Sequence, residues 1–295
     1  MDIVMIGHSG AGKTSYMAAM YEAMSSGVSG FSVRAERQAD HTALVKDARL
    51  LQKGKFPPAS SQRKVYRLQL WFSGQRVFDF VWHDYRGGAL TETSSSRQAM
   101  ELRSDLATGG GLVILLDSTE LTGGIRAQAR VRPLVATAIR MLSQQESVMP
   151  MAIVLTKWDL VRNVDKTLDA AGDVFGELVD AVAKTSNICG ALIPVSTTQD
   201  LVSVTLPVMW CLHIGIAIRQ VALMEAIKQQ YTVAQVAAVN DTWWDRTKSW
   251  FNGETPWKDI HAQTLAAARA QEAHLEPLIA PSQGLSVLLD PIAKF

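Results

Sequence analysis

The sequence predicts an α/β protein with a mostly parallel β-sheet flanked by helices. Short apolar runs typical of buried strands alternate along the chain with longer segments of helical periodicity. This alternation favours strand–helix–strand units, and hence a parallel sheet with helices on both faces. Several of the apolar runs end directly in polar or glycine-rich turns. Because ligands bind open α/β sheets at the carboxyl ends of the strands, these turns are the first place to look for a functional site.

The first part of the chain is predicted to form three strands and two helices. The run Ile3–Ile6 is the first strand, and residues Thr14–Met24 follow it as a helix. The long segment that comes next contains one further helix, Glu36–Leu51. Two alternating runs, Lys64–Phe72 and Arg76–Trp82, are separated by a Ser-Gly-Gln turn and predict an antiparallel hairpin at the edge of the sheet.

The middle of the chain adds three strands and two helices. The predicted strands are Leu112–Leu116, Met151–Leu155 and Ala191–Val195. The predicted helices between them are Ile125–Leu142 and Leu168–Thr185. The expected fold is therefore a mostly parallel six-stranded sheet with one antiparallel edge strand.

The remaining residues are predicted to be mainly helical. The apolar run Leu206–Ile218 is shorter than the roughly 20 residues that span a membrane. We therefore expect a buried helix that continues to about Ala238, and no transmembrane segment. This divides the chain into a domain of residues 1–238 and a C-terminal extension of residues 239–295.

The extension holds a cluster of tryptophans and one helix. The cluster lies within residues 243–257, and the helix Ala262–Glu276 is expected to stop at Pro277. Clustered tryptophans are compatible with an interaction surface or a membrane-interface element. The alternative is a tail packed on its own domain.

The residues Gly7–Thr14 read GHSGAGKT and match the pattern GxxxxGK[ST] directly after the first predicted strand. In this pattern glycines let backbone N–H groups curl around phosphate oxygens, the lysine neutralises their charge, and the hydroxyl binds Mg²⁺. The helix that follows directs its positive N-terminal end at the same phosphates. The pattern predicts a nucleoside triphosphate site. Its predicted ligands are Ser9, Gly10, Ala11, Gly12, Lys13, Thr14 and Ser15, with Lys13 also catalytic and Thr14 also binding Mg²⁺.

A second motif, Thr156-Lys157-Trp158-Asp159, follows the predicted strand Met151–Leu155. A carboxylate at Asp159 would accept hydrogen bonds from N1–H and the exocyclic amine of guanine, a pattern that adenine lacks. Such a site discriminates strongly, because the wrong base leaves a buried carboxylate unpaired. Lys157 would lie against the ring, and Thr156 would link back to the phosphate loop. The alternative is that Asp159 only caps a short helical turn.

Two weaker motifs complete the set. Asp84 and Gly87 form a DxxG pattern after a predicted strand. The pattern looks like the third motif of GTPases, and this resemblance implies that Asp84 would hold Mg²⁺ through water and that the N–H of Gly87 would sense the γ-phosphate. Ser196 and Thr197 follow the last predicted strand and resemble the SAK-like loop of GTPases, which implies that a backbone amide there would meet guanine O6. All four motifs stand at the carboxyl ends of predicted strands.

With these motifs in this order, the chain resembles the Ras-like superfamily of P-loop GTPases over roughly residues 1–238. The opening GHSGAGKTSYMAAMYEAM and the element Phe56–Ser60 are most similar to the bacterial double-GTPase family, whose members are often encoded beside signalling or conflict-system genes. The resemblance implies a G domain, GTP and GDP as substrate and product, and Mg²⁺ as the cofactor.

Two departures from the Ras pattern bear on hydrolysis. Gly88 stands where Ras-like enzymes place the glutamine that orients the attacking water, and Ser9 crowds the place of an arginine finger. Because charge stabilisation supplies most of the catalysis of phosphoryl transfer, we expect slow intrinsic hydrolysis. Arg86 and His83 are local candidates for the missing group, each with an ordinary structural alternative. Activation by a partner or a second copy is the other source.

A hydroxyl from the segment before the Lys64 strand is expected to close on Mg²⁺. Ser60 fits the spacing, and Ser61 and Thr42 are alternatives. The predicted metal ligands are therefore Thr14, Asp84 and Ser60.

Composition limits the partners and the location. The chain has 29 basic and 28 acidic residues and a net charge of +1, so no charge field attracts nucleic acid. Its two cysteines, Cys189 and Cys211, lie in apolar runs, which suggests free thiols in a reducing compartment. No signal-peptide pattern is visible, so we expect a cytoplasmic protein. The expected partner is a protein effector or activator, or a second copy bound in a nucleotide-dependent homo-oligomer.

Two functions fit this pattern. In the first, the chain is a GTP hydrolase that acts as a GTP/GDP conformational switch, with slow turnover that depends on a partner or a dimer. In the alternative, it is a GTP-binding assembly or scaffold module with little or no hydrolysis.

Overall fold

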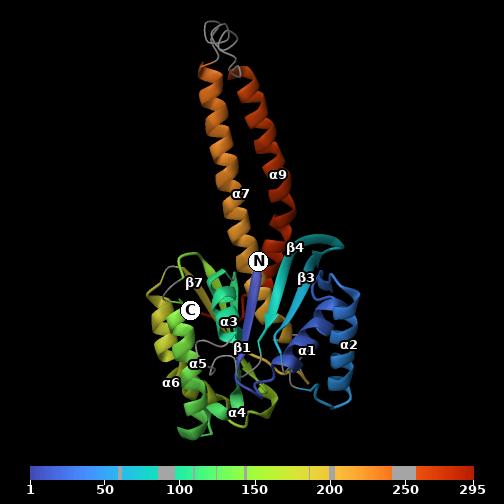
Figure 1. Cartoon of the computed structure of the whole chain (residues 1–295), viewed down its shortest axis with the longest axis vertical. Helices are drawn as coiled ribbons and strands as arrows, with labels where there is room; N and C mark the ends of the chain where they lie inside the picture. Colours follow the sequence, from blue (N-terminus) through green and yellow to red (C-terminus); the bar gives the residue numbers. More distant parts are fainter. Residues whose placement is uncertain are drawn as a thin grey trace. The chain divides into compact units, whose positions relative to one another are not determined.

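The computed structural model describes residues 1–58, 62–85, 97–108, 110–123, 125–142, 145–185, 187–198, 203–240 and 257–295. These residues form two compact units. The first consists of Met1–Gly215 and Gly284–Phe295, and the second of Ile216–Gln283. The predicted α/β class is confirmed in the first unit, which holds a mixed, mostly parallel sheet (Figure 1).

The described strands form one eight-stranded sheet in the order β2-β3-β4-β1-β5-β6-β7-β8. The five central strands are mutually parallel. The outer strands pair antiparallel with their neighbours: β2 with β3, β3 with β4, and β8 with β7. Their bounds are β1 (Asp2–Gly7), β2 (Phe31–Ala35), β3 (Lys64–Phe72), β4 (Gln75–Asp84), β5 (Gly111–Asp117), β6 (Met149–Thr156), β7 (Ile188–Pro194) and β8 (Ala293–Lys294).

The described sheet has two strands more than the six predicted. β2 lies within the segment where only a helix was expected, and it pairs along β3 from Phe31↔Phe72 to Ala35↔Leu68. β8 lies at the end of the chain, where Ala293 pairs with Leu192 of β7. The prediction of a single antiparallel edge strand is therefore wrong, because β2, β3 and β8 all pair antiparallel with their neighbours. Both added strands are short and pair with distant segments, so local periodicity gives them little signal.

Eight helices and two short 3₁₀ turns are described. The helices are α1 (Lys13–Ser26), α2 (Gln38–Gln52), α3 (Arg97–Thr108), α4 (Ser118–Leu121), α5 (Ile125–Leu142), α6 (Val164–Ala183), α7 (Leu206–Asn240) and α9 (Trp257–Leu288). The turns are η1 (Trp158–Leu160) and η2 (Ser203–Thr205). The predicted helix Ile125–Leu142 coincides with α5, and α3 and α4 were not predicted.

The core of the first unit lies on the two faces of the sheet. One face carries alternate residues such as Ile114 of β5 and Ile153 of β6, packed with α3, α5 and α6. Figure 1 shows α1 and α2 on one side of the sheet and α5 and α6 on the other. Tyr16 of α1 packs against Trp82 of β4, with ring centroids 6.2 Å apart. The carboxyl ends of β1, β4, β5, β6 and β7 are thereby held side by side.

The second unit contains the paired parts of α7 and α9. The Gln220 side chain donates to the Leu278 carbonyl oxygen at 3.0 Å, and the Tyr231 hydroxyl donates to Glu272 at 2.8 Å. The predicted stop at Pro277 is wrong, because α9 continues through Pro277 and Pro281 to Leu288. The buried Leu278 and its carbonyl contact hold the helix where proline propensity alone would end it.

The segment Ser203–Gln235 is long and apolar enough to cross a membrane by length and composition, although half of its most apolar window is buried within the structure. Near the start of α7, within this segment, Val208, Met209, Cys211 and Leu212 are fully buried. A buried core helix passes the same test, so the expected absence of a transmembrane segment stays a prediction.

Candidate functional site

The phosphate loop joins β1 to α1 and leaves the first turn of that helix open to an anion. Gly10 and Gly12 have φ angles of 86° and 83°, in the left-handed region that favours glycine. Gly12 is the N-cap of α1 and offers no side-chain hydrogen bond, and the first turn contains no acidic residue. The backbone N–H groups and the helix dipole are therefore available to bind phosphate.

Close packing between β1 and β5 requires a glycine at Gly7, the last residue of β1. A Cβ atom added there would lie 2.6 Å from the Leu115 carbonyl oxygen on β5. The two parallel strands can therefore pair closely at the point where the loop begins.

Lys13 is the buried cation of the phosphate loop. Its Nζ donates to the carbonyl oxygens of Gly7 and His8 at 2.7 and 3.0 Å. Burial lowers the pKa of Lys13 to about 8, and the nearby Asp84 partly opposes this shift. The lysine is thus held across the loop, with its charge directed at the place where the motif binds phosphate.

Asp84, the last residue of β4, is the buried anion of the same site. Its side chain is 2% exposed, and Oδ1 has no hydrogen-bond partner among the described residues. Burial raises the pKa of Asp84 to about 6, opposed by Lys13 and Lys64. A buried carboxylate oxygen without a partner is unusual, and it fits a hydrated divalent cation held between this strand and the phosphate loop.

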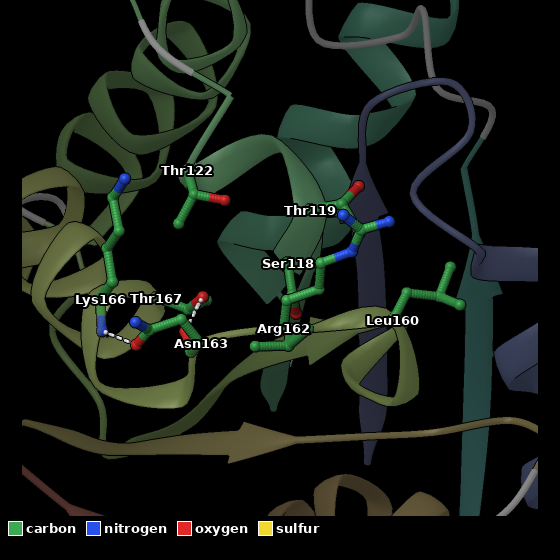
Figure 2. A pocket seen from close by; sticks show the side chains of 9 residues that line it. Ser118, Thr119, Thr122, Leu160, Arg162, Asn163, Lys166 and Thr167 are labelled. Atoms are coloured by element: carbon green, nitrogen blue, oxygen red, sulfur yellow. Dashed lines mark hydrogen bonds between the residues drawn. The ribbon is translucent and has the colours of Figure 1, made fainter.

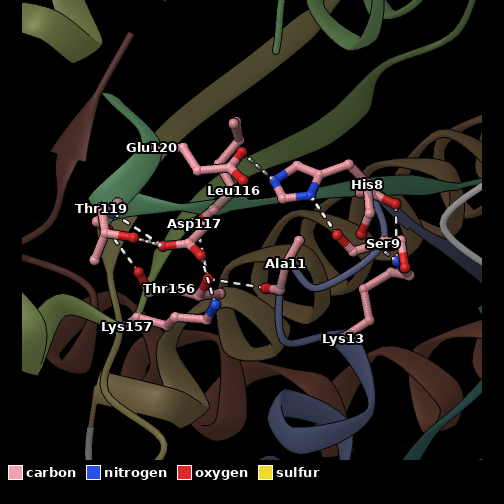
Figure 3. Close-up of polar contacts among 12 residues, drawn as sticks. His8, Ser9, Ala11, Lys13, Leu116, Asp117, Thr119, Glu120, Thr156 and Lys157 are labelled. Atoms are coloured by element: carbon pink, nitrogen blue, oxygen red, sulfur yellow. Dashed lines mark hydrogen bonds and ion pairs between the residues drawn. The ribbon is translucent and has the colours of Figure 1, made fainter. Parts of the chain in front are cut away.

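The motif Thr156–Asp159, which we call the base motif, is tied to the phosphate loop by a hydrogen bond. The Thr156 hydroxyl, at the end of β6, lies 2.8 Å from the carbonyl oxygens of both Ala11 and Leu116 (Figure 3). Its single proton is therefore shared between the phosphate loop and β5. This is the link back to the loop that the sequence analysis predicted for Thr156.

Lys157 is oriented by a carboxylate that the sequence analysis did not identify. Its backbone has a φ angle of 56°, and its Nζ forms an ion pair with Asp117 Oδ2 at 2.5 Å. Burial would raise the pKa of Asp117, but hydrogen bonds from Lys157 and Thr119 outweigh it and lower that pKa. Ser118 strengthens the same corner by donating to the Thr156 carbonyl oxygen at 2.6 Å.

The two predicted base loops contact each other at their tips. The Thr198 hydroxyl donates to Asp159 Oδ2 at 3.2 Å, and the Trp158 N–H donates to the Val195 carbonyl oxygen at 3.2 Å. Ser196 is buried in the loop after β7, and Thr197 is half-buried beside it. Asp159 therefore lies at the carboxyl end of the sheet. Its carboxylate accepts a hydrogen bond from the uncharged Thr198 hydroxyl and is partly exposed to solvent.

A second unpredicted contact joins the phosphate loop to α4. The His8 side chain lies with Nε2 3.1 Å from Glu120 Oε2, and its Nδ1 lies 2.8 Å from the Ser9 carbonyl oxygen (Figure 3). The loop residue His8 is thereby held against α4. No sequence signal pairs His8 with Glu120, because the two belong to separate elements.

A partly buried polar cluster surrounds the strand end next to Asp84, and we call its members Arg63, His83, Tyr85 and Asp105 the Asp105 cluster. Asp105 of α3 accepts a hydrogen bond from the Tyr85 hydroxyl at 2.6 Å and pairs with Arg63. His83 lies with Nδ1 2.9 Å from the same carboxylate and with Nε2 3.0 Å from Asp2 Oδ1. These contacts favour the structural alternative for His83 over a role in ordering water.

Two cavities lie beside the base motif. One of about 430 Å³ opens between α4 and the loop that leads into α6, with the side chains of Arg162 and Lys166 at its rim (Figure 2). Asn163 accepts from the Lys166 N–H there at 3.0 Å and so caps α6. The other cavity, of about 570 Å³, is bounded by Trp158, Asp159 and Ser196 and by residues near the end of the chain.

The remaining predicted residues divide into those the structure places and those it does not. Ala11 is buried in the loop, Ser9 is exposed on it, and Thr14 and Ser15 begin α1 half-buried. Thr42, an alternative metal ligand, instead donates to the Gln38 carbonyl oxygen within α2. Ser60, Ser61, Arg86, Gly87, Gly88 and most of the tryptophan cluster lie outside the described residues.

A glycine-rich phosphate loop after β1, an aspartate at the end of β4 and polar loops after β6 and β7 all lie at the carboxyl edge of one mostly parallel sheet, which is the arrangement of a P-loop nucleotide-binding protein. Residues 3–188 match the family model "Double-GTPase 2", which covers more than half of the chain. The chain therefore belongs to the Double-GTPase 2 family, and this membership implies that it binds GTP. No curated protein sequence matched the chain.

Comparison with solved structures gives matches at low identity. One is the signal recognition particle receptor SRb-GTP/SRX complex from Chaetomium thermophilum, with 14% identity over 68% of this chain and 91% of that chain, at a TM-score of 0.42. The S. cerevisiae Ski7 GTPase-like domain bound to GTP matches at 13% identity over 71% of this chain and 44% of that chain, with a TM-score of 0.40. A variant of Aquifex aeolicus Era bound to GDP.AlF4- matches at 12% identity over 67% of this chain and 51% of that chain, with a TM-score of 0.37.

Proposed function

We propose that this protein is a guanine-nucleotide switch that binds GTP with Mg²⁺ and hydrolyses it slowly to GDP and phosphate. The observation that carries the proposal is the hydrogen bond from Thr156 to Ala11, because it joins the base motif and the phosphate loop into one site. Gly10, Gly12 and Lys13 would hold the phosphates, and Asp159 would select guanine.

Mg²⁺, when bound, would neutralise charge that develops on the β- and γ-phosphate oxygens. Thr14 and Asp84 would hold it, the latter through water, with Ser60 as the proposed third ligand. Oδ1 of Asp84, which has no hydrogen-bond partner within the described part of the chain, supports this assignment. Lys13 would contribute its positive charge from beneath the same phosphates, where burial strengthens its effect.

Hydrolysis would proceed by attack of a water oxygen on the γ-phosphorus. The bond to the β–γ bridging oxygen breaks, GDP carries away that electron pair, and the water proton leaves with the inorganic phosphate. Gly88 offers no side chain to orient the water, and His83 is held in the Asp105 cluster. We therefore propose that an effector, an activating partner or a second copy raises a slow intrinsic rate.

The second candidate function is a GTP-binding assembly module without useful turnover. Gly88 is the observation that favours it, since the chain lacks the usual water-orienting glutamine. For either function we place the protein in the cytoplasm, a proposal supported by the free thiols of Cys189 and Cys211.

Titration of the nucleotide-stripped protein with GTP and ATP in Mg²⁺, followed by single-turnover phosphate release, tests the proposal. Selective GTP binding with slow release supports the switch, and selective binding with no release supports the assembly module. Preference for ATP would contradict both. Lys13→Ala should abolish binding in a folded protein, because the phosphate charge then lacks its buried counter-charge.

A further inference from the structure

The last residues of the chain form an edge strand beside one of the base loops. β8 pairs antiparallel with β7, with Ala293 opposite Leu192 and Lys294 opposite Ala191. Phe295 and Gly190 extend the pairing by exchanging backbone hydrogen bonds of 2.8 and 3.0 Å. Without these residues β7 would be the edge of the sheet, with unpaired N–H and C=O groups along its outer side.

Gly190 makes room for the ring of Phe295. A Cβ atom added to Gly190 would lie 2.3 Å from the nearest ring carbon of Phe295. The ring also packs against the core cluster that includes residues of α5 and α6. The terminal residue is therefore seated in the fold by both its backbone and its side chain.

The same C-terminal segment helps to enclose the 570 Å³ cavity behind the base motif. Pro291, Ile292 and Ala293 line this cavity together with Trp158, Asp159 and Ser196. Ser203 and Leu206, where α7 begins, also line this cavity. Residues of both base loops and of the C-terminal segment thus line the same cavity.

The position of the base loops depends on the end of β7. The loop that carries Ser196 starts one residue after Pro194, and the Val195 backbone bonds to both Leu155 and Trp158. A carboxylate that reads a base edge must be placed within a few tenths of an ångström, because hydrogen bonds weaken steeply with poor geometry. Whatever fixes β7 therefore affects how well Asp159 and its neighbours meet guanine.

We propose that the C-terminal segment Pro291–Phe295 is a positioning element of the guanine site. By completing the edge of β7 and closing the cavity behind Asp159, it sets the affinity for the base and leaves the affinity for the triphosphate unaffected. This inference rests on the proposed function, since it assigns the segment to the same nucleotide site.

Three variants and one control test it. Deletion of residues 291–295 removes the segment, Phe295→Ala removes only the ring, and Gly190→Ala displaces the ring while the chain keeps its full length. Gly172→Ala on α6 is the matched control, because an added Cβ meets no atom within 4 Å there. The dissociation constants of GTP and ATP are measured by competition in Mg²⁺, and folding is monitored by circular dichroism and thermal denaturation.

We expect the deletion and Gly190→Ala to weaken GTP binding about tenfold, equivalent to about 1.4 kcal/mol. ATP binding should be unchanged, so the selectivity for GTP falls by the same factor. Phe295→Ala should show a smaller loss of GTP affinity, again with ATP binding unchanged. If the other two variants do not fold, the result for Phe295→Ala tests the proposal alone. Gly172→Ala should change neither affinity.

Unchanged selectivity in a folded variant would overturn the proposal, as would an equal loss of GTP and ATP affinity, which indicates general destabilisation. A failure of the proposed guanine-nucleotide function itself gives a different result. In that case the unaltered protein itself shows no preference for GTP over ATP.

Discussion

The hydroxyl of Thr156 lies 2.8 Å from the carbonyl oxygen of Ala11, so the base motif and the phosphate loop are joined by a single buried side chain. Thr156 is 1% exposed, and no solvent can replace its proton. Two motifs that are 145 residues apart in sequence, and that we propose form one nucleotide site, are thereby fixed to each other.

Thr156→Val should therefore weaken GTP binding without unfolding the protein. Valine keeps the shape of threonine but leaves the carbonyl groups of Ala11 and Leu116 without their donor, at a cost of about 1–3 kcal/mol. We expect a lower melting temperature and a several-fold higher Kd for GTP, measured by calorimetry. Thr137→Val is the control, since that hydroxyl donates to Pro133 in an exposed turn of α5. Equal effects of the two substitutions would contradict the link.

Tyr85→Phe should destabilise the strand end that carries Asp84. The substitution removes the partly buried hydrogen bond from Tyr85 to Asp105, which lies at 2.6 Å. Loss of a hydrogen bond to a charged group costs about 1.5–3 kcal/mol, so the melting temperature should fall by several degrees. The matched control is Tyr231→Phe, which removes a similar 2.8 Å bond to Glu272 at an exposed position and should change little. A Tyr85→Phe protein as stable as the unaltered one would show that the Asp105 cluster is not rigid.

The nucleotide-free protein should lose stability as the pH rises from about 4 to about 6. Burial raises the pKa of Asp84 from 3.8 to about 6, so in this window the folded state binds more protons than the unfolded state. Stability is highest while Asp84 is protonated and falls as it ionises. The full penalty corresponds to at most about 3 kcal/mol.

Asp84→Asn should remove this pH dependence and raise the melting temperature at pH 7, measured in EDTA without nucleotide. It should also weaken binding of Mg²⁺–GTP, because the cation loses its carboxylate. Asp169→Asn, at an exposed position on α6, serves as the control. An unchanged slope of stability against pH in Asp84→Asn would assign the effect to another group.

Sequence alone located the parts of the fold whose signal is local. β3 and α5 were predicted with their observed bounds, because alternation and helical periodicity are both complete within them. β2 was missed because its five residues gain stability only from β3, which lies far along the sequence. α9 was ended too early because a proline disfavours a helix by about 3 kcal/mol, and only contacts between helices, such as that of Gln220 with Leu278, offset this.

In the candidate site, too, only the residues with a local sequence signal were predicted. Motifs placed Asp84, Thr156 and Asp159 at or just after strand ends, and Lys13 at the start of the first helix, because each motif is contiguous in the chain. The acidic partners of Lys157, His8 and Tyr85 were missed, since Asp117, Glu120 and Asp105 come from other elements and belong to no motif. Their roles depend on pairings such as Asp117 with Lys157, which only the folded chain brings together.

The central claim is that Asp159 selects guanine within this site, and the nucleotide preference of Asp159→Asn tests it most directly. The altered amide complements xanthine in place of guanine, so the Kd for GTP should rise about 100-fold while xanthosine triphosphate gains affinity. Asp165→Asn, an exposed change near the start of α6, should leave the preference for GTP intact. If Asp159→Asn binds GTP as tightly as the unaltered protein and gains nothing for xanthosine triphosphate, Asp159 does not read the base and the account of this site is wrong.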